Sequence, residues 1–412
     1  MAKKQGASAT NPLDNIMGSL STEMEDMVAF ENTDAGMVLD WLPTMVPSLD
    51  SVLMGGLPLS GRVTEVFGEP SVGKSTFVMR LIATAQKLGI FPVYYDVEGT
   101  TNKDRLANLG VNPNRIGTLQ PKVHKDGTVT PLTIETIIEN MITVSSRVHK
   151  ANPETPVLFI WDTVAQTQSN IQEQAGTGQQ TMGQQARALS EGIRKLNVNL
   201  MANNASLIAL NQARADINGN PFLKEMKTIG GNAWQHEMSL RLAMYRASKE
   251  TVSTTDKTEI GHTVKLKFVK SKVGDNAGAM AEAVLLQRTG FDVEYNIFVE
   301  AVDKGLVKSG SWPTYTDDAG TEHKFQTKAK FIEFLNTEEG IPVATELWQK
   351  LIKIYFPECY PPLFNVYAIM TTEQYPYLAG LRDYYIGIQE ALPDSQQHTQ
   401  YRLWKKESAN AK

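Results

Sequence analysis

The sequence predicts an α/β fold with a mainly parallel β-sheet and antiparallel additions at one side. Its 412 residues suffice for one large core and one or two smaller units. Helical patterns separate short, nearly continuous apolar runs: RVTEVFG, FPVYYDVE, PVLFIWD and SLIALNQ. Parallel strands that are buried on both faces have this composition. The later runs EMSLRLAMY and HTVKLKFVK alternate apolar and polar residues without long helices between them, which favours antiparallel strands.

Composition divides the chain into three parts. Residues 1–45 are a predicted N-terminal helical segment, because apolar side chains recur at helical spacing between residues 11 and 30. Residues 46–310 hold the sheet. From residue 311 the chain becomes rich in Tyr and Pro, so residues 311–412 are predicted to form a small C-terminal α/β accessory domain. The apolar face of the N-terminal helix needs a surface to pack on, either on its own core or on another subunit.

Charge and composition exclude several classes of protein. A formal net charge of -5 argues against coating nucleic acid by bulk positive charge, so any such contact has to come from local loops. The single Cys359 excludes an internal disulfide and favours a reducing compartment. No apolar run resembles a signal peptide or reaches the roughly 18 residues of a membrane span. The scattered histidines indicate no zinc site. We therefore expect a cytoplasmic protein without a membrane partner.

The segment GEPSVGKST, residues 68–76, has the spacing of a phosphate-binding loop. It follows a predicted strand and opens a predicted helix, which is the context that the motif requires. Glycines let backbone amides approach the phosphates, the helix N-terminus is positive, and the lysine adds a charge. The serine hydroxyl is suited to hold Mg²⁺. We assign to ATP binding Gly68, Glu69, Pro70, Ser71, Val72, Gly73, Lys74, Ser75 and Thr76.

Acidic and amide side chains follow the neighbouring strands. Asp162 ends VLFIWD and is predicted to bind Mg²⁺ together with Ser75, although an Asp after a strand is also a common turn residue. Glu98, in the segment YYDVEG, is placed to orient or deprotonate the attacking water. Asp96 is the alternative, or else a satisfied residue at the strand end. Gln212, at the end of SLIALNQ, is a candidate sensor of the terminal phosphate.

Two lysines extend the apolar face of a predicted strand. In VKLKFVKSKVG the even positions share one face, so Lys270 and Lys272 continue the face of Phe268. Burying an unpaired ammonium group costs several kcal/mol, which points these lysines toward anions. The alternative is that the strand ends at Phe268 and both lysines reach solvent.

The ordered series of motifs resembles the RecA recombinase family. It covers roughly residues 43–315. A phosphate loop alone occurs in many families, whereas this series in this order is specific to RecA-like recombinases. The matching segments are VPSLDSVLMGGLPLSGRVTEVFGEPSVGKST, YYDVEG, VLFIWDTVAQTQSNIQEQ, MGQQARALSEGIRKL, LIALNQARADINGNP, TIGGNAW, VKLKFVKSKVG and AVDKGLVKSGSWPTY.

The resemblance implies an ATPase core of the RecA type and roles for the candidate residues. Glu98 corresponds to the catalytic glutamate, and Gln212 to the switch that couples the terminal phosphate to a DNA-binding loop. Lys270 and Lys272 correspond to a pair that reaches the phosphates of a neighbouring subunit's ATP. Catalytic roles thus fall to Glu98, Lys74, Gln212, Lys270 and Lys272, and nucleotide binding also takes in Asn102 and Arg105.

The resemblance also implies two DNA-contacting loops, at about residues 169–182 and 213–231. The second loop contains Asp216 and Glu225 beside its cations, so one subunit should bind DNA weakly and many loops should add up. A solvated or locally paired arginine is the alternative at each cationic position. The predicted DNA contacts are Met182, Arg187, Arg194, Arg214, Lys224, Lys227, Gly230, Gly231 and Asn232.

Together these patterns predict a recombinase that depends on ATP and Mg²⁺ and forms helical filaments on single-stranded DNA. It would pair that strand with homologous double-stranded DNA, with ATP at the interfaces of a homo-oligomer and with loader or single-strand-binding proteins as further partners. A ring-forming helicase or motor and an ATP-binding mediator of recombination are the rival interpretations. The segment PKVHKDGTVTPL is predicted as an inserted loop or hairpin. This insertion, the N-terminal helix and the C-terminal part depart from the family and suggest a phage-encoded or otherwise divergent member.

Overall fold

The computed structural model describes most of the chain from residue 41 onward. The described residues are 41–53, 55–153, 155–175, 183–215, 226–252, 256–274, 277–355, 386, 387, 389–394, 401 and 405. The chain separates into two compact units, Met1–Val38 and Leu39–Lys412. The predicted N-terminal helix and most of the Tyr-rich C-terminal segment lie outside the described residues.

One nine-stranded sheet organises the described chain, in the order β13-β12-β11-β3-β9-β8-β4-β5, with β10 pairing to β9. From β11 to β5 every neighbouring pair is parallel, whereas β12, β13 and β10 are added antiparallel. This confirms the predicted fold class. The strands are β3 (Val63–Gly68), β4 (Phe91–Asp96), β5 (Gly117–Leu119), β8 (Val157–Asp162), β9 (Ala205–Ala215), β10 (Met226–Thr228), β11 (Leu240–Thr251), β12 (Glu259–Ser271) and β13 (Met280–Leu286).

The prediction for one strand was wrong. The run EMSLRLAMY was assigned to the antiparallel additions, but β11 pairs parallel with β3 and only its other edge is antiparallel, to β12. The reason is the short helix α8 (Gly231–Glu237), which provides the crossover between β9 and β11. A helix of two turns did not stand out in the sequence as a crossover element.

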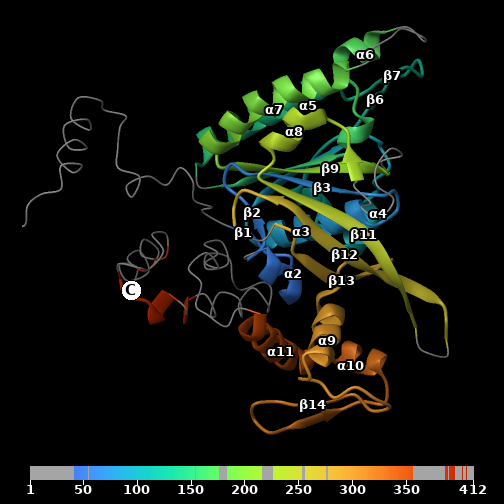
Figure 1. Cartoon of the computed structure of the whole chain (residues 1–412), viewed down its shortest axis with the longest axis vertical. Coiled ribbons are helices and arrows are strands. Elements are labelled where there is room, and N and C mark those ends of the chain that lie inside the picture. The colour runs from blue at the N-terminus through green and yellow to red at the C-terminus, as the bar shows by residue number, and fades with distance from the viewer. Residues whose placement is uncertain are drawn as a thin grey trace, which may run out of the picture. The chain divides into compact units, whose positions relative to one another are not determined.

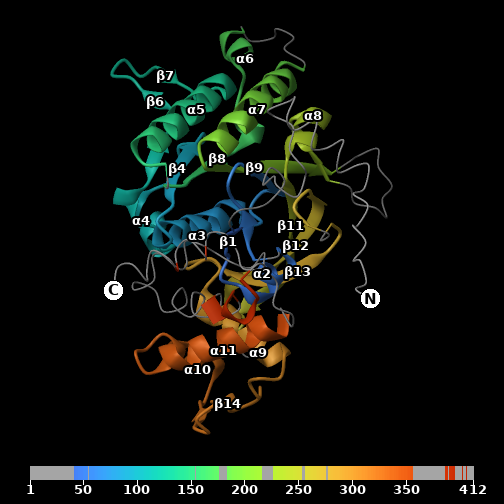
Figure 2. The same cartoon turned by 90° about the vertical axis from the view of Figure 1, so that its left-hand side faces the viewer.

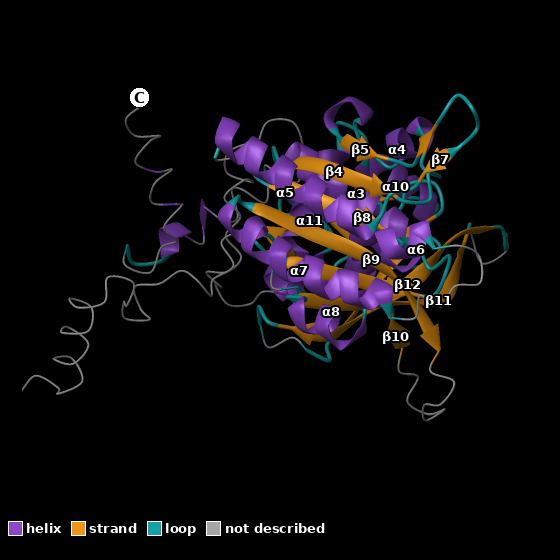
Figure 3. Cartoon of the chain, turned by 90° about the horizontal axis from the view of Figure 1, so that it is seen from above, coloured by secondary structure: helices purple, strands orange, loops and turns teal. Residues whose placement is uncertain are grey.

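Helices cover both faces of the sheet. One hydrophobic cluster joins a face of the sheet to α5 (Ile134–Ala151), α7 (Gln184–Ala202) and α8. The other cluster joins the opposite face to α3 (Lys74–Lys87). Figure 1 shows α7 and α8 on one side of the strands and α3 on the other, and Figure 3 shows α5, α7 and α8 lying over the strands. The parallel strands are therefore buried on both faces, as their near-continuous apolar sequences require.

Smaller elements complete the described chain. The predicted insertion is a hairpin of β6 and β7, and Figure 2 shows it at the same end as α6. None of the described helices is both long and apolar enough to cross a membrane. The remaining elements are β1 (Trp41–Leu42), α2 (Pro47–Val52), β2 (Leu57–Pro58), α4 (Lys103–Asn108), β6 (Lys122–Val123), β7 (Val129–Thr130), α6 (Asn170–Gln174), α9 (Val293–Asp303), β14 (Thr314–Thr316), β15 (Glu322–Lys324), α10 (Lys328–Leu335) and α11 (Gly340–Tyr355), with 3-10 turns at Pro113–Arg115 and Val164–Gln166.

The described helices after residue 311, α10 and α11, pack on the same hydrophobic cluster as α3. Phe331 of α10 and Trp348 of α11 are fully buried in that cluster. Trp41 and Met45, at the other end of the described chain, are also buried. The domain boundaries at residues 45 and 311 stay predictions.

Candidate nucleotide site and DNA-loop stem

The phosphate loop joins β3 to α3 and depends on its two glycines. A Cβ at Gly68 would lie 2.5 Å from the carbonyl oxygen of Met244 on the neighbouring strand β11. Gly73 has φ +105°, a left-handed conformation that favours glycine, and is the N-cap residue of α3. Both positions therefore require glycine for the loop to turn tightly between the sheet and the helix. A helix N-terminus of this kind can bind an anion through its backbone N–H groups.

Lys74 folds back into this loop. Its Nζ donates hydrogen bonds to the carbonyl oxygens of Gly68 and Glu69, at 3.0 and 2.9 Å. Burial lowers the pKa of Lys74, and the carboxylates of Asp162 and Glu98 oppose that shift. The ammonium group thus lies inside the loop and near two acidic groups, where a phosphate would be its strongest partner.

Ser75 and Asp162 form an oxygen-rich site beside the loop. Asp162 ends β8, and its Oδ2 accepts a hydrogen bond from the Tyr94 hydroxyl at 2.8 Å. Burial raises the pKa of Asp162, while hydrogen bonds from Ser75 and Tyr94 lower it. A half-buried carboxylate next to a hydroxyl is a donor set that suits Mg²⁺, which prefers oxygen ligands. The predicted pair of metal ligands is therefore brought together.

Asp96 and Glu98 differ sharply in their surroundings. Asp96 is buried, and its carboxylate accepts hydrogen bonds from the backbone of Thr100 and Thr101 and from Gln120 Nε2. It is a satisfied residue at the end of β4. Glu98 is exposed, and partial burial together with Asp162 and Asp96 raises its pKa. Of the two acids, Glu98 has the freedom to contact a water molecule.

A pocket of about 380 Å³ opens beside the phosphate loop. Arg105 lines it and donates from Nη2 to Thr76 Oγ1 at 3.0 Å. Asn102 does not line this pocket; it caps α4 by accepting the backbone N–H of Arg105 at 2.8 Å. The far wall consists of residues that sequence reasoning missed: Arg246, Glu259, His262, Leu285 and Gln287.

That wall comes from β11, β12, β13 and the turn after β13, far along the chain. His262 Nε2 lies 3.2 Å from the carbonyl oxygen of Val72 in the phosphate loop. No local motif marks these residues. Only the pairing of β12 with β11 and β13 brings them to the loop, and the residue-by-residue register of that pairing has no signal in the sequence.

Gln212 lies between the phosphate loop and the second predicted DNA loop. In the parallel pair of β3 and β9, Gln212 is in register with Gly68. Directly after it, Ala213–Ala215 of β9 pair antiparallel with β10 and form a two-stranded stem. The backbones of Arg214 and Lys227 are in register on this stem, while Lys224 lies outside the described residues.

The other predicted DNA contacts vary in what the structure shows. Met182 lies outside the described residues. Arg187 and Arg194 are exposed on α7, with carboxylate oxygens of Glu191 and Glu237 at 2.9 and 3.9 Å. Exposed ion pairs of this kind contribute little, about 0–1 kcal/mol, so a phosphate can compete for the arginines.

The glycines at the start of α8 have a structural reason. Gly230 has φ +115°, and a Cβ there would lie 2.7 Å from Cγ of Trp234. Gly231 also has a positive φ of +70°, but a Cβ there would make only an ordinary contact, 3.9 Å from Cβ of Ala186. Asn232 is exposed. Glycine at 230 is therefore required by the packing of α8, whether or not DNA approaches.

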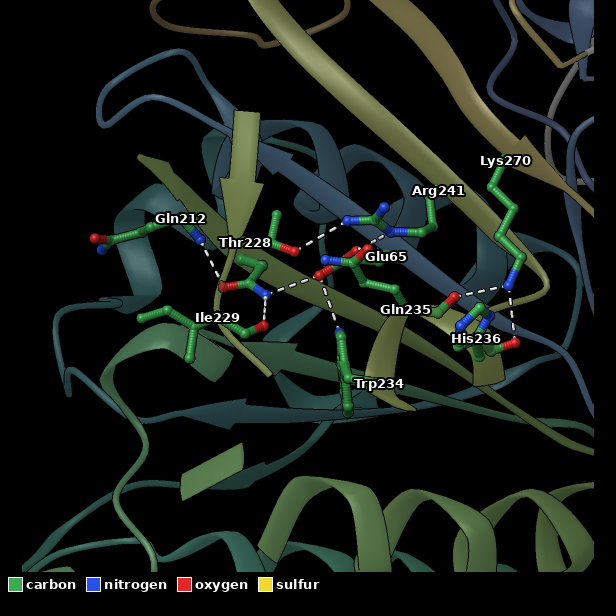
Figure 4. Close-up of polar contacts among 10 residues, drawn as sticks. Glu65, Gln212, Thr228, Ile229, Trp234, Gln235, His236, Arg241 and Lys270 are labelled. Carbon is green, nitrogen blue, oxygen red and sulfur yellow. Dashed lines mark hydrogen bonds and ion pairs between the residues drawn. The ribbon is translucent and has the colours of Figure 1, made fainter. Parts of the chain in front are cut away.

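The strand-parity argument for the two lysines was wrong in its geometry. The register of β12 against β11 shifts at Val269, so the alternation does not run unbroken from Phe268 to Lys270. Lys270 Nζ instead donates to the carbonyl oxygens of Gln235 and His236, at 2.7 and 2.8 Å, at the C-terminal end of α8 (Figure 4). Burial lowers the pKa of Lys270, with Lys272 and Arg241 adding to the effect. Lys272 is exposed.

A phosphate loop between β3 and α3, with carboxylates at the ends of neighbouring parallel strands, defines a P-loop nucleotide-binding protein. Comparison with known proteins narrows the class further. A family model described as the RecA N-terminal domain matches residues 31–291. The chain belongs to the RecA family.

Similar proteins agree with this family. Protein RecA of Borrelia duttonii is 31% identical over 332 residues, which cover 80% of this chain and 84% of that protein. A mitochondrial DNA repair protein recA homolog of Dictyostelium discoideum is 31% identical over 76% of this chain and 64% of its own length. Protein RecA of Treponema denticola is 27% identical over 90% of this chain and 86% of its own. Family membership supports a recombination and repair role and, at the family level, a DNA-dependent ATPase that uses ATP with Mg²⁺ and acts on DNA as an oligomer.

Proposed function

We propose that this protein is an ATP-dependent DNA recombinase that assembles into helical filaments on single-stranded DNA. It pairs the bound strand with homologous double-stranded DNA and exchanges strands. The observation that carries the proposal is the course of β9. This strand runs beside β3 to Gln212, in register with Gly68 of the phosphate loop, and then continues directly into the stem of the second loop. One strand thus links the nucleotide site to a candidate DNA contact.

The proposed ATPase chemistry uses the residues around the phosphate loop. Lys74 would leave its carbonyl partners to bind phosphate oxygens, and Ser75 with Asp162 would hold Mg²⁺. The ion would supply positive charge that neutralises the phosphates. Glu98 orients or deprotonates the attacking water. Asn102 orients Arg105 through the cap of α4, and Arg105 contacts the nucleotide within the pocket.

Assembly supplies the remaining charges. Lys270 and Lys272 would reach the ATP of a neighbouring subunit, where positive charge stabilises the transition state. ATP then bridges subunits, and hydrolysis lowers the affinity of the filament for DNA. Loader or single-strand-binding proteins are proposed partners, and the expected cytoplasmic location stays a prediction from the sequence.

Two rival functions follow from the same core. A ring-forming helicase or motor would couple hydrolysis to movement along DNA, and a mediator would bind ATP but scarcely hydrolyse it. The accessible Glu98 beside Asp162 and Lys74 favours an ATPase over a mediator. The segment TIGGNAW and the paired lysines favour the recombinase over the motor.

Electron microscopy tests the proposal most directly. Purified protein is mixed with Mg²⁺, single-stranded DNA and a slowly hydrolysed ATP analogue. We expect long helical filaments that disappear with Lys74→Ala and persist with Lys87→Ala, a matched change at the other end of α3. Closed rings would favour the motor. Isolated particles from a correctly folded protein would contradict the proposal, and strand exchange between homologous DNAs would complete its confirmation.

A further inference from the structure

The carboxylate of Glu65 lies in the middle of β3 and is completely buried. Its Oε1 accepts hydrogen bonds from Asn211 Nδ2 at 2.7 Å and from Trp234 Nε1 at 2.9 Å. Its Oε2 accepts one from Arg241 Nε at 2.5 Å. Figure 4 shows Trp234 and Arg241 pointing toward Glu65. We call Glu65, Asn211, Trp234 and Arg241 the Glu65 junction. Every member is buried, with at most 6% of its surface exposed.

The Glu65 junction ties together four elements, because its donors come from β9, α8 and β11 and its acceptor from β3. A buried carboxylate that loses a hydrogen-bond donor, and still more one that loses its cationic partner, is strongly destabilised. None of the four elements can shift alone without breaking one of these bonds. The junction therefore favours a small number of joint arrangements over independent movement.

Asn211 and Arg241 connect the Glu65 junction to the end of β9 beside the phosphate loop and to the stem of the second predicted DNA loop. Asn211 Oδ1 accepts the backbone N–H of Gln212 at 2.9 Å, and Asn211 Nδ2 also donates to the carbonyl oxygen of Ile229 at 2.8 Å. Arg241 Nη2 donates to Thr228 Oγ1 at 2.9 Å. Thr228 ends β10, and Ile229 leads into α8.

We propose that Glu65 is a positioning residue that couples the nucleotide site to the second DNA loop. It holds the backbone of Gln212, next to the phosphate loop, in fixed relation to the stem at Thr228 and to α8. When the terminal phosphate displaces Gln212, the junction carries the displacement into the loop. The inference rests on the proposed function, in which nucleotide binding controls DNA affinity.

The junction predicts which property a mild substitution changes. Weakening it leaves the nucleotide pocket intact, since neither Glu65 nor Trp234 lines that pocket. What is lost is the coupling between nucleotide and DNA, that is, the change in DNA affinity when nucleotide binds. The affinity for each ligand alone is not the affected quantity. A residue with only a structural role would lower thermal stability without changing the coupling.

The test compares Trp234→Phe with Trp348→Phe. Both tryptophans are fully buried, but the Trp348 indole nitrogen has no hydrogen-bond partner among the described residues, so its replacement removes similar volume and no such bond. Affinity for single-stranded DNA is measured with and without a slowly hydrolysed ATP analogue, together with analogue affinity, ATPase rate without DNA and thermal unfolding. Glu65→Gln is the stronger variant of the same series.

We expect the analogue-induced gain in DNA affinity to fall by about threefold or more in Trp234→Phe, while basal ATPase and analogue affinity stay within about twofold. Trp348→Phe should keep the full gain. An equal gain in wild type and Trp234→Phe, or a loss that matches the loss of thermal stability in both variants, would overturn the inference. If the wild-type protein shows no analogue-dependent DNA affinity, the proposed function itself fails, and the inference fails with it.

Discussion

The phosphate site and the Glu65 junction share strand β3 and use the same kinds of side chain, yet their hydrogen bonding differs. At the phosphate site Lys74 contacts only backbone carbonyls, and Glu98 is exposed with a raised pKa. At the junction the carboxylate of Glu65 has donors on both oxygens, including the guanidinium of Arg241. The first site has charges that lack strong partners, and the second has charges that are fully paired.

The difference separates binding from positioning. Charged groups with few hydrogen-bond or ion-pair partners in the folded chain gain the most interaction energy when a ligand binds. The charged groups of the phosphate site are therefore suited to exchange their present partners for a ligand. A saturated buried network gains nothing from a ligand and holds its neighbours in place. Substitution should accordingly reduce turnover at the phosphate site and stability at the junction.

The largest effect is expected for Lys74→Ala. Removing the only cation of the phosphate loop should lower the kcat/KM of ATP hydrolysis by about 10³-fold or more, because that charge stabilises the transferring phosphoryl group. The free energy of unfolding should change little, since Lys74 contacts only carbonyl groups. Steady-state ATPase assays and denaturant titrations measure both quantities. If Lys74→Ala lost as much free energy of unfolding as of transition-state stabilisation, the phosphate site would not differ from the Glu65 junction in this respect.

Glu98→Gln should follow, with a decrease in kcat of about 10²-fold or more through loss of the group that orients the water. Because the Glu98 side chain is exposed, its replacement should not disturb the fold, and the affinity for a slowly hydrolysed ATP analogue should be retained. Single-turnover hydrolysis and analogue titration separate the two effects. Asp96→Asn serves as the comparison: it weakens a satisfied turn at the same strand end and should affect folding more than chemistry.

At the Glu65 junction we expect substitution to reduce stability more than ATPase activity. Glu65→Gln leaves Arg241 buried without its counter-charge and should reduce the free energy of unfolding by about 3 kcal/mol or more. Asp162→Asn removes a half-buried charge whose pKa burial has raised, so the folded chain should gain stability at neutral pH while Mg²⁺-dependent hydrolysis is lost. Denaturant unfolding of both variants without nucleotide measures these changes in the free energy of unfolding. Equal destabilisation by the two substitutions would show that the sites do not differ.

The same contrast explains what the sequence could predict. The phosphate loop, Asp162 and Glu98 are local motifs at strand ends, and the fold class follows from apolar runs that report burial directly. The far wall of the pocket, including Glu259 and His262, depends on which strands pair across long sequence separations, and no local pattern encodes that.

Lys270 and Glu65 show why strand alternation and composition could not predict every side-chain position. The face of Lys270 could not be predicted because a one-residue bulge at Val269 breaks the alternation, and bulges leave no clear signature in a single sequence. In the sequence, nothing distinguishes Glu65 of RVTEVFG from other polar residues in strands. Its role requires donors from Asn211, Trp234 and Arg241, which come together only after α8 crosses over the sheet.

The smallest effect concerns Asp50, a buried carboxylate that forms no ion pair with a cation among the described residues. Asp50 accepts hydrogen bonds from the backbone and hydroxyl of Thr44 and from the backbone of Met45, and burial raises its pKa from 3.8 to about 8. Because the folded state holds this proton more tightly than the unfolded state, the stabilisation is complete below pH 4 and is lost as pH rises toward 8, with a slope of at most about 1.4 kcal/mol per pH unit.

Asp50→Asn should therefore flatten the decline of unfolding free energy between pH 5.5 and 7.5, because the amide retains the shape of the protonated acid and does not titrate. Asp126→Asn, at the exposed β6–β7 turn, should leave that decline unchanged, since its low pKa keeps it ionised throughout the range. Denaturant unfolding across pH measures the slopes. If Asp50→Asn behaves like Asp126→Asn, then burial without a cation does not hold a proton on this chain, and Arg241 is not what distinguishes the Glu65 junction from other buried carboxylates.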